Sequence, residues 1–150
     1  MLFFLGIIML IIADQVTKVW AVNHLIGKGA LPWIDGLLGF RYTENTGAAF
    51  SILREKQLLL ILVTSVIIVG LIGFLVKALR TETHVVVKWA YMLLISGAIG
   101  NLIDRVRFNY VIDFLEFKFI NFPIFNIADV CVVIGVSLLA IATLFLKYDF

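Results

Sequence analysis

The sequence is poor in charge, cysteine and histidine. Charged residues make up 15% of its 150 residues, and the net charge is only +2. The single cysteine, Cys131, cannot form an internal disulfide, and His24 and His84 are too far apart to suggest a metal site. The basic residues are scattered and do not form a stripe, which argues against nucleic acid as a partner. We therefore expect no disulfide, no metal and no nucleic acid.

The sequence is rich in apolar residues. They account for 63% of the chain, against about 45 to 50% in an average soluble domain. A transmembrane helix needs about 20 predominantly apolar residues, and four segments approach that length. We predict an all-α integral membrane protein that forms a single domain over residues 1–150. The four transmembrane helices are expected at residues 2–22, 58–76, 85–103 and 127–146.

The first apolar segment could instead be a cleaved signal peptide. It has no basic residues before it and no A-x-A cleavage pattern, so we interpret it as a helix. Four spans put both termini on one side of the membrane, and the loops 23–57 and 104–126 on the other. Lysine and arginine occur on both sides, so the positive-inside rule does not decide the orientation.

The two long loops contain strand signals. Asp35 and Gly36 form a turn pair, and the residues after them are aromatic or β-branched. Residues 108–125 are dense in aromatics, as is typical of the headgroup level of a membrane. We predict a small β-rich surface region, or cradle, on the side of these loops. Alternation in VIDFLEFKF predicts one common face for Val111, Asp113, Leu115, Phe117 and Phe119.

Polar residues gather at the ends of the apolar segments. Such residues are costly in a membrane and are therefore candidates for function. Because the four spans run up and down, these ends meet at the same membrane face. The residues are Asp14, Gln15, Lys18, Asn101, Asp104, Arg105, Asn126 and Asp129, with Glu44 and Asn45 from the first long loop.

Several of these residues also have a structural interpretation. Asp14 and Lys18 lie four residues apart on one helical face and could pair with each other. Asn101, Asp104 and Arg105 share a face and could form a buried ion pair at the end of the third helix.

The start of the fourth helix and a group of small residues have similar alternatives. Asn126 and Asp129 fit an N-cap followed by an acid at the third helical position, which the helix dipole favours. Gly97 and Gly100 have the spacing that permits close helix contact.

Asp113 lies in an apolar stretch with no basic residue within four positions. If it faces Asp129, the two carboxylates cannot both ionise easily and will share a proton. One could then accept a proton from water while the other protonates a substrate carbonyl. The motifs G-x-S-x-G, H-E-x-x-H and G-x-G-D are absent, and Cys131 has only apolar neighbours. Elimination favours an enzyme that works through aspartates.

A small transporter or proton-relay protein is the alternative, because acids in a membrane also mark ion pathways. That alternative predicts acids near mid-membrane on facing helices. Here Asp14, Asp104 and Asp129 all lie at segment ends.

Five sequence blocks together resemble the bacterial lipoprotein signal peptidase family, also called signal peptidase II. They occur in the family's order and span most of the chain. They are DQVTK (14–18), NTGAAFSIL (45–53), GAIGNLIDR (97–105), VIDFL (111–115) and FPIFNIADV (122–130). One departure from the family is that Met1 runs straight into apolar sequence without a basic leader.

The resemblance implies an aspartyl endopeptidase of the bacterial inner membrane, with cytoplasmic termini and an extracytoplasmic active site. It implies prolipoprotein substrates that are cut just before a diacylglyceryl-modified cysteine. Membrane lipids are the other expected partner, no cofactor is required, and we expect a monomer. The implied catalytic dyad is Asp113 and Asp129. The implied supporting residues are Asp14, Asn45, Asn101, Asp104, Arg105 and Asn126.

We expect Asn45, Asn101, Arg105 and Asn126 to hold the peptide backbone of a substrate. Asp14 and Asp104 are expected to orient those donors.

Overall fold

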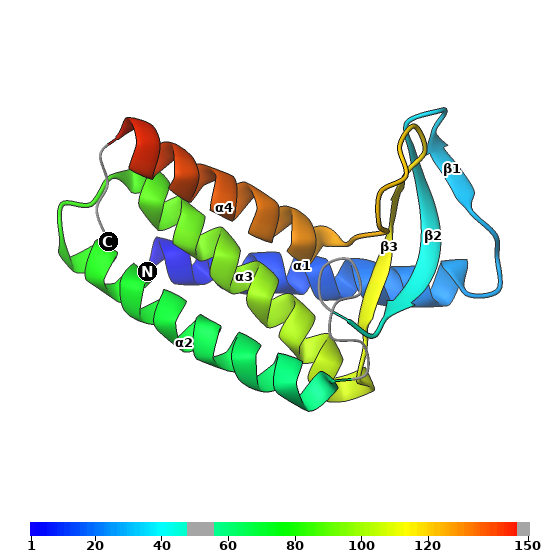
Figure 1. Ribbon diagram of the computed structural model, residues 1–150, viewed down its shortest axis with the longest axis horizontal. Helices are drawn as coiled ribbons and strands as arrows, with labels where there is room; N and C mark the ends of the chain where they lie inside the picture. The colour runs from blue at the N-terminus through cyan, green and yellow to red at the C-terminus, as the bar shows by residue number, and fades with distance from the viewer. Residues whose placement is uncertain (48–55, 147–150) are drawn as a thin grey trace.

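The computed structural model describes residues 1–47 and 56–146. Four helices run alongside one another, and a small sheet stands across one end of the bundle (Figure 1). The start of α1, the end of α4 and the α2–α3 connection lie at the opposite end. The helices are α1 (Leu2–Leu25), α2 (Gln57–Arg80), α3 (Val85–Phe108) and α4 (Ile127–Phe145), and the strands are β1 (Leu31–Ile34), β2 (Leu38–Asn45) and β3 (Val111–Phe117).

All four helices are long and apolar enough to cross a membrane. The predicted fold class, four transmembrane helices with a small β-rich region, is therefore confirmed. Residues 48–53 of one motif block lie outside the described residues.

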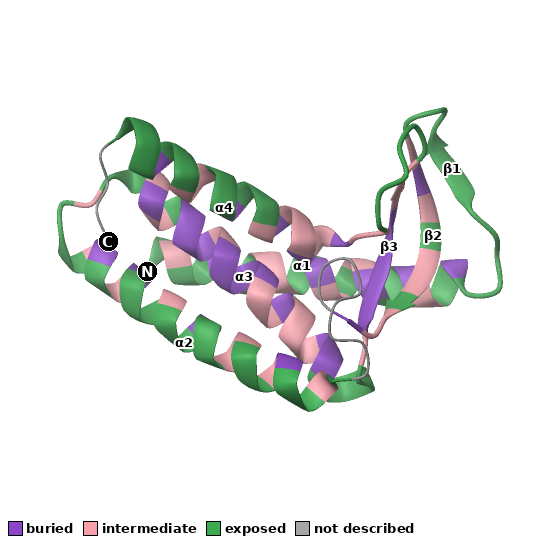
Figure 2. Cartoon of the chain, viewed as in Figure 1, coloured by how far each residue is buried: buried purple, intermediate pink, exposed green. Residues whose placement is uncertain are grey.

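Helix α3 forms the centre of the bundle and packs against the other three helices. Half of its most apolar stretch is buried, whereas the other three helices leave most of theirs exposed (Figure 2). The buried cluster at the centre includes Leu75, Val87, Tyr91 and Ile95. The outward faces of α1, α2 and α4 expose leucine, isoleucine and valine. An apolar exterior is what a helix bundle presents to lipid, where backbone groups must be satisfied within each helix.

The sheet is antiparallel, with strand order β1-β2-β3. The predicted turn at Asp35 and Gly36 joins β1 to β2, and Gly36 has a φ of +69°, which favours glycine. Pairing between β2 and β3 places Thr43 opposite Asp113. The last turns of α1 pack against β3 through Ala21 and Leu25. The sheet is thus fixed to the bundle where the polar segment ends meet.

The third helix is longer than predicted, and the expected loop start at residue 104 is wrong. Helix α3 continues to Phe108 and ends at Asn109, which adopts a left-handed φ of 63° and donates its N–H to the Arg105 carbonyl. A left-handed C-cap terminates helices in this way. Asp104 and Arg105 are therefore held on a rigid helix.

The prediction for residues 111–119 is also partly wrong. Strand β3 ends at Phe117, so Phe119 lies outside it. Residues 111–115 are buried throughout and do not alternate between buried and exposed. Ile112 packs near the end of α1, whereas Asp113 contacts Asn126 at the start of α4. Strand β3 is thus enclosed, which buries Asp113.

Candidate active site

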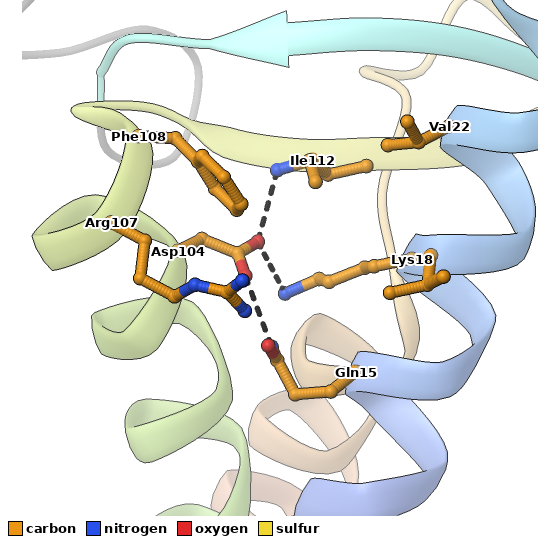
Figure 3. A pocket seen from close by; sticks show the side chains of 8 residues that line it. Gln15, Lys18, Val22, Asp104, Arg107, Phe108 and Ile112 are labelled. Carbon is orange, nitrogen blue, oxygen red and sulfur yellow. Dashed lines mark hydrogen bonds and ion pairs between the residues drawn. The ribbon is translucent and has the colours of Figure 1, made fainter.

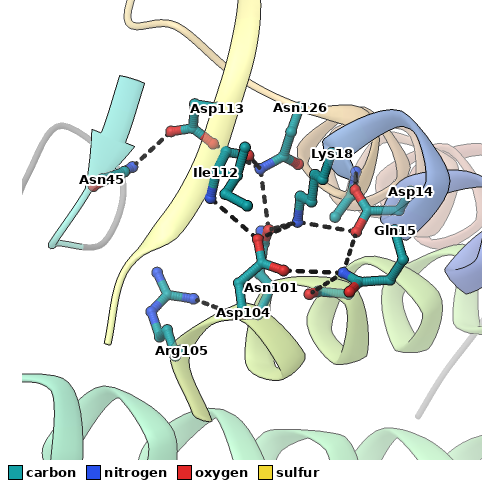
Figure 4. A network of polar contacts seen from close by, with 12 residues as sticks. Asp14, Gln15, Lys18, Asn45, Asn101, Asp104, Arg105, Ile112, Asp113 and Asn126 are labelled. Atoms are coloured by element: carbon teal, nitrogen blue, oxygen red, sulfur yellow. Dashed lines mark hydrogen bonds and ion pairs between the residues drawn. The ribbon is translucent and has the colours of Figure 1, made fainter. Parts of the chain in front are cut away.

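The predicted polar residues converge where the sheet meets the bundle (Figure 4). Side chains from α1, α3, α4, β2 and β3 meet there, and hydrogen bonds and ion pairs join them into one network. The network contains all eight predicted site residues: Asp14, Asn45, Asn101, Asp104, Arg105, Asp113, Asn126 and Asp129.

Asn126 joins the two aspartates of the predicted dyad. Its side-chain Nδ2 donates to Asp113 Oδ1 at 2.7 Å, and its backbone N–H donates to Asp129 Oδ2 at 3.1 Å. Its own Oδ1 accepts from the Asp129 N–H at 2.9 Å. The predicted N-cap of α4 is therefore confirmed, and with the Asp129 side chain it forms a capping box. Within the described ranges, neither aspartate has an ion pair. One residue therefore holds both carboxylates together with no cation paired to either.

Two further asparagines complete the hydrogen bonds to the dyad. Asn45 Nδ2 donates to Asp113 Oδ2 at 3.0 Å, and Asn101 Nδ2 donates to Asp129 Oδ1 at 2.8 Å. Within the described part of the chain, each of the four carboxylate oxygens therefore accepts one N–H. A carboxylate oxygen has two lone pairs, so capacity remains on each for a proton or a water molecule.

The orientation of each asparagine amide is fixed at its oxygen. Asn45 Oδ1 accepts from the backbone N–H of Gly47 at 3.0 Å. Asn101 Oδ1 accepts from both Lys18 Nζ and Asn126 Nδ2 at 3.1 Å. Because an N–H can only donate, a flipped amide would set donor against donor. The three NH₂ groups are thus directed at the dyad.

Asp113 is the member of the pair that lies outside the helices, on β3. Burial raises the pKa of Asp113 to about 7, and the nearby charge of Asp129 adds to the rise. Hydrogen bonds from Asn45 and Asn126 and the charge of Lys18 oppose this increase in pKa. A pKa near neutrality suits a group that must exchange a proton during a reaction.

A second cluster centres on Lys18, whose Nζ lies 2.9 Å from Asp14 Oδ2 and 2.9 Å from Asp104 Oδ2 (Figure 4). The predicted pairing of Asp14 with Lys18 is confirmed. The suggested ion pair between Asp104 and Arg105 is wrong, because Asp104 pairs with Lys18. Arg105 Nη2 instead donates to the carbonyl of Gly47 at 2.9 Å.

The carboxylates of this cluster also hold the backbone beside the dyad. Asp14 Oδ1 accepts from the N–H of Ala128, in the first turn of α4, at 2.9 Å. Asp104 Oδ2 accepts from the N–H of Ile112, next to Asp113, at 3.1 Å. Sequence reasoning missed that Lys18 connects α1 to α3. The available signal was that the sequence places two acids, Asp14 and Asp104, at the same end of the expected bundle as Lys18.

Gly97 and Gly100 allow α3 to approach its neighbours closely, as predicted. A Cβ on Gly97 would lie 2.3 Å from the carbonyl oxygen of Ala128. A Cβ on Gly100 would lie 2.6 Å from Asp14 Oδ2. The absence of these side chains therefore sets the position of both α4 and Asp14.

A cleft of about 210 Å³ reaches Asp113 from the surface. A smaller pocket of about 110 Å³ lies between α1 and α3, beside Lys18 (Figure 3). Of these two, the larger cleft is the one that includes a member of the dyad, Asp113, in its lining. It is lined by Thr43, Glu44, Asn45, Thr46, Asp113, Pro123 and Ile124.

The described part of the chain contains no group of three or more histidine, cysteine, aspartate or glutamate residues placed to hold a metal ion. The chemistry that the network itself can support is acid and base work by two carboxylates.

Comparison with known proteins gives consistent matches. A family model described as "Signal peptidase (SPase) II" matches residues 6–145. Two curated relatives named lipoprotein signal peptidase, from Streptococcus pyogenes serotype M5 (strain Manfredo) and serotype M18 (strain MGAS8232), are each 41% identical over 142 residues. Each match covers 93% of this chain and 91% of the relative.

Two solved structures share the fold. Both are described as a bacterial membrane enzyme structure by the in meso method, one at 2.3 Å and one at 1.9 Å resolution. The first is 34% identical with a TM-score of 0.86, and the match covers 99% of this chain and 92% of that one. The second is 35% identical with a TM-score of 0.85, and the match covers 95% and 92%.

Proposed function

The chain belongs to the signal peptidase II family, whose members are aspartic-type peptidases, and we propose that it removes signal peptides from diacylglyceryl-modified prolipoproteins. Asp113 and Asp129 are the catalytic dyad of this proposal, and residues 1–150 act as one peptidase domain. The chain is a multi-pass membrane protein. Cleavage takes place just before the lipidated cysteine.

The observation that carries the proposal is the bridge through Asn126. It holds Asp113 Oδ1 by its side chain and Asp129 Oδ2 by its backbone. Asp113 is buried and Asp129 is half-buried. Two such carboxylates held together, with no paired cation among the described residues, are costly, and sharing one proton relieves that cost. The raised pKa of Asp113 is consistent with a pair that holds one proton near neutral pH.

In the proposed reaction, the dyad binds one water molecule. The ionised carboxylate removes a proton from this water as its oxygen attacks the scissile carbonyl carbon. The protonated carboxyl group gives its proton to the carbonyl oxygen, so the tetrahedral intermediate carries two hydroxyl groups. The asparagine donors keep each carboxylate in place during this exchange.

Collapse of the intermediate breaks the C–N bond. The leaving nitrogen takes up a proton from the dyad, and one hydroxyl group of the intermediate returns a proton to the dyad as the C=O bond re-forms. The products are a signal peptide with a new C-terminal carboxyl group and a lipoprotein with a free amino group on its cysteine. Peptide and water balance these products, so no cofactor is needed.

The cleft beside Asp113 is the proposed peptide site. It opens between the strand residues Thr43 to Asn45 and the segment at Pro123 and Ile124. An extended peptide in this cleft would meet the dyad at the level of the sheet, with its acyl chains left in lipid. Asp113 lies on β3, in the sheet across one end of the bundle (Figure 1), and Asp129 lies in the first turn of α4, which favours a peptidase over an ion pathway.

The proposal places the sheet and dyad outside the cytoplasm and both termini inside. A lipidated precursor becomes accessible on the outer side after export, which supports this orientation. Labelling tests it directly: in a Cys131→Ala background, a membrane-impermeant thiol reagent should modify Gly29→Cys in intact cells but not Glu82→Cys. Both positions are exposed, at opposite ends of the bundle. The reverse pattern would overturn the orientation.

Peptide cleavage tests the activity. Purified protein is incubated with a diacylglyceryl-cysteine lipobox peptide and with the same peptide lacking lipid, and products are identified by mass. Wild type should cut only the lipidated peptide, before cysteine. Asp113→Asn and Asp129→Asn should lose at least about 10³-fold in turnover, whereas Asp35→Asn, in the exposed β1–β2 turn, should not. Equal cleavage of both peptides would refute the substrate class.

A further inference from the structure

Lys18 is a buried ammonium group with a contact that its charge alone does not require. Its side chain is 1% exposed. It has three N–H donors and three acceptors: Asp14 Oδ2 and Asp104 Oδ2 at 2.9 Å, and Asn101 Oδ1 at 3.1 Å. The two carboxylates already compensate its positive charge. The third contact, to a neutral amide, leads toward the dyad.

Asn101 connects Lys18 to Asp129. Its oxygen accepts from Lys18, and its Nδ2 donates to Asp129 Oδ1 at 2.8 Å. If the amide flipped, its NH₂ group would face an ammonium group and an oxygen would face a carboxylate. The first change would place a donor against a donor, and the second would place an acceptor against an acceptor. Lys18 therefore holds this amide in one orientation.

The other two asparagines of the dyad are held by backbone N–H groups. Asn45 accepts from Gly47, and Asn126 accepts from Asp129. Asn101 is the member of the three whose oxygen is held by a charged side chain. A charge-assisted hydrogen bond is about twice as strong as a neutral one.

We propose that Lys18 is a positioning residue for peptide hydrolysis, which acts through Asn101 to keep that amide directed at Asp129 and supplies a positive charge that favours the singly ionised dyad. The inference rests on the proposed function of Asp113 and Asp129. It assigns to the Asp14–Lys18 pair a role in the reaction in addition to its role in packing.

The charged groups around Lys18 determine what its removal does. Asp14 on α1 and Asp104 on α3 contact it directly, and the dyad lies beyond Asn101. Arg105, also on α3, is turned toward the carbonyl of Gly47, and the exposed Arg107 lines the pocket beside Lys18. Without Lys18, two uncompensated acids would face a dyad that must itself carry a negative charge. Ionisation of the dyad then requires a higher pH.

The test compares Lys18→Met with Gln15→Ala. Gln15 Nε2 donates to the same two acids, Asp14 Oδ2 at 3.2 Å and Asp104 Oδ1 at 3.0 Å, and to the carbonyl of Gly100 at 3.2 Å, but among the described residues it makes no hydrogen bond to the Asn101 side chain. On the lipidated peptide, Lys18→Met should lower kcat at least about tenfold with little change in KM. It should also move the acidic limb of the pH–rate profile to higher pH. Gln15→Ala should keep the wild-type kcat and profile.

Folding is controlled by a charge-matched variant. Lys18→Met with Asp104→Asn keeps the net charge of the cluster and is compared with Asp104→Asn alone, which retains the Lys18–Asn101 contact. The double variant should again show the lower kcat. In an Asn101→Ala background, and at a pH above the acidic limb of the profile, Lys18→Met should cost little further kcat, because the group it positions is gone.

The outcomes separate this inference from the proposed function. If folded wild type cleaves the peptide, and folded variants lacking Lys18 keep its kcat and pH profile, the positioning role is refuted while the dyad stands. Full additivity of the Lys18 and Asn101 substitutions would also refute it. If wild type does not cleave the peptide, the proposed function itself has failed.

Discussion

Gly97→Ala should impair both folding and cleavage, because Gly97 sets the distance between α3 and α4. The new Cβ would lie 2.3 Å from the carbonyl oxygen of Ala128 and 2.7 Å from Val132 Cγ2. Ordinary contact begins near 3.4 Å, so α4 must move by about 1 Å, and a 1 Å misplacement of a catalytic group can cost about 10²-fold in rate. Asp129 is in the first turn of that helix. Overpacking typically costs about 1–3 kcal/mol of stability.

Gly70→Ala on α2 is the matched control, since a Cβ there meets nothing within 4 Å. Alanine is the better helix former by about 1 kcal/mol, so this variant should be neutral or slightly more stable. Thermal unfolding in detergent and turnover of the lipidated peptide are measured on both variants. If Gly97→Ala matched the control in unfolding midpoint and turnover, the close approach of α3 and α4 would not position Asp129.

Two further predictions concern the dyad and its bridge. The pKa of Asp113 is about 7 in the folded protein, above the value of about 3.9 that an aspartate has in an unfolded chain. The contribution of Asp113 to stability is therefore present below about pH 4 and is lost as pH rises to about 7. Asp113→Asn should therefore flatten this part of the curve of unfolding midpoint against pH; an unchanged slope would contradict the assignment. Asn126→Ala removes the α4 cap, worth about 1 kcal/mol, and should lower the unfolding midpoint. Asn126→Asp keeps an acceptor for the Asp129 N–H but adds a third carboxylate at the bridge, so it should fold and fail to cleave the peptide; wild-type turnover would contradict the bridging role.

The helices could be predicted from the sequence because apolar length alone determines a membrane span. The end of α3 could not be predicted, since local capping decides it. Helix α3 ends at Phe108 because Asn109 adopts a left-handed conformation and caps it. Nothing in the apolar pattern of the sequence marks that position. Enclosure of β3 likewise depends on α1, whose last turn reaches the sheet through Leu25.

The sequence predicted which residues form the site more fully than it predicted the contacts between them. Unpaired Asp113 and the cap motif at Asn126 and Asp129 are features of local sequence, so they could be recognised without a structure. The contacts of Lys18 with Asn101 and Asp104 span more than 80 positions of the sequence, and only the packing of α1 on α3 creates them. The asparagine donors were expected to hold substrate, whereas the structure directs their amides to the dyad.

The central claim is that Asp113 and Asp129 activate one water molecule as a unit. Its most direct test is the turnover of the lipidated peptide by four folded proteins: wild type, Asp113→Asn, Asp129→Asn and the variant with both substitutions. Because groups that act as a unit are strongly non-additive, each single variant should lose at least about 10³-fold, and the double variant should lose little more. A single variant within tenfold of wild type, or a double variant whose loss is the product of the two single losses, would contradict the account.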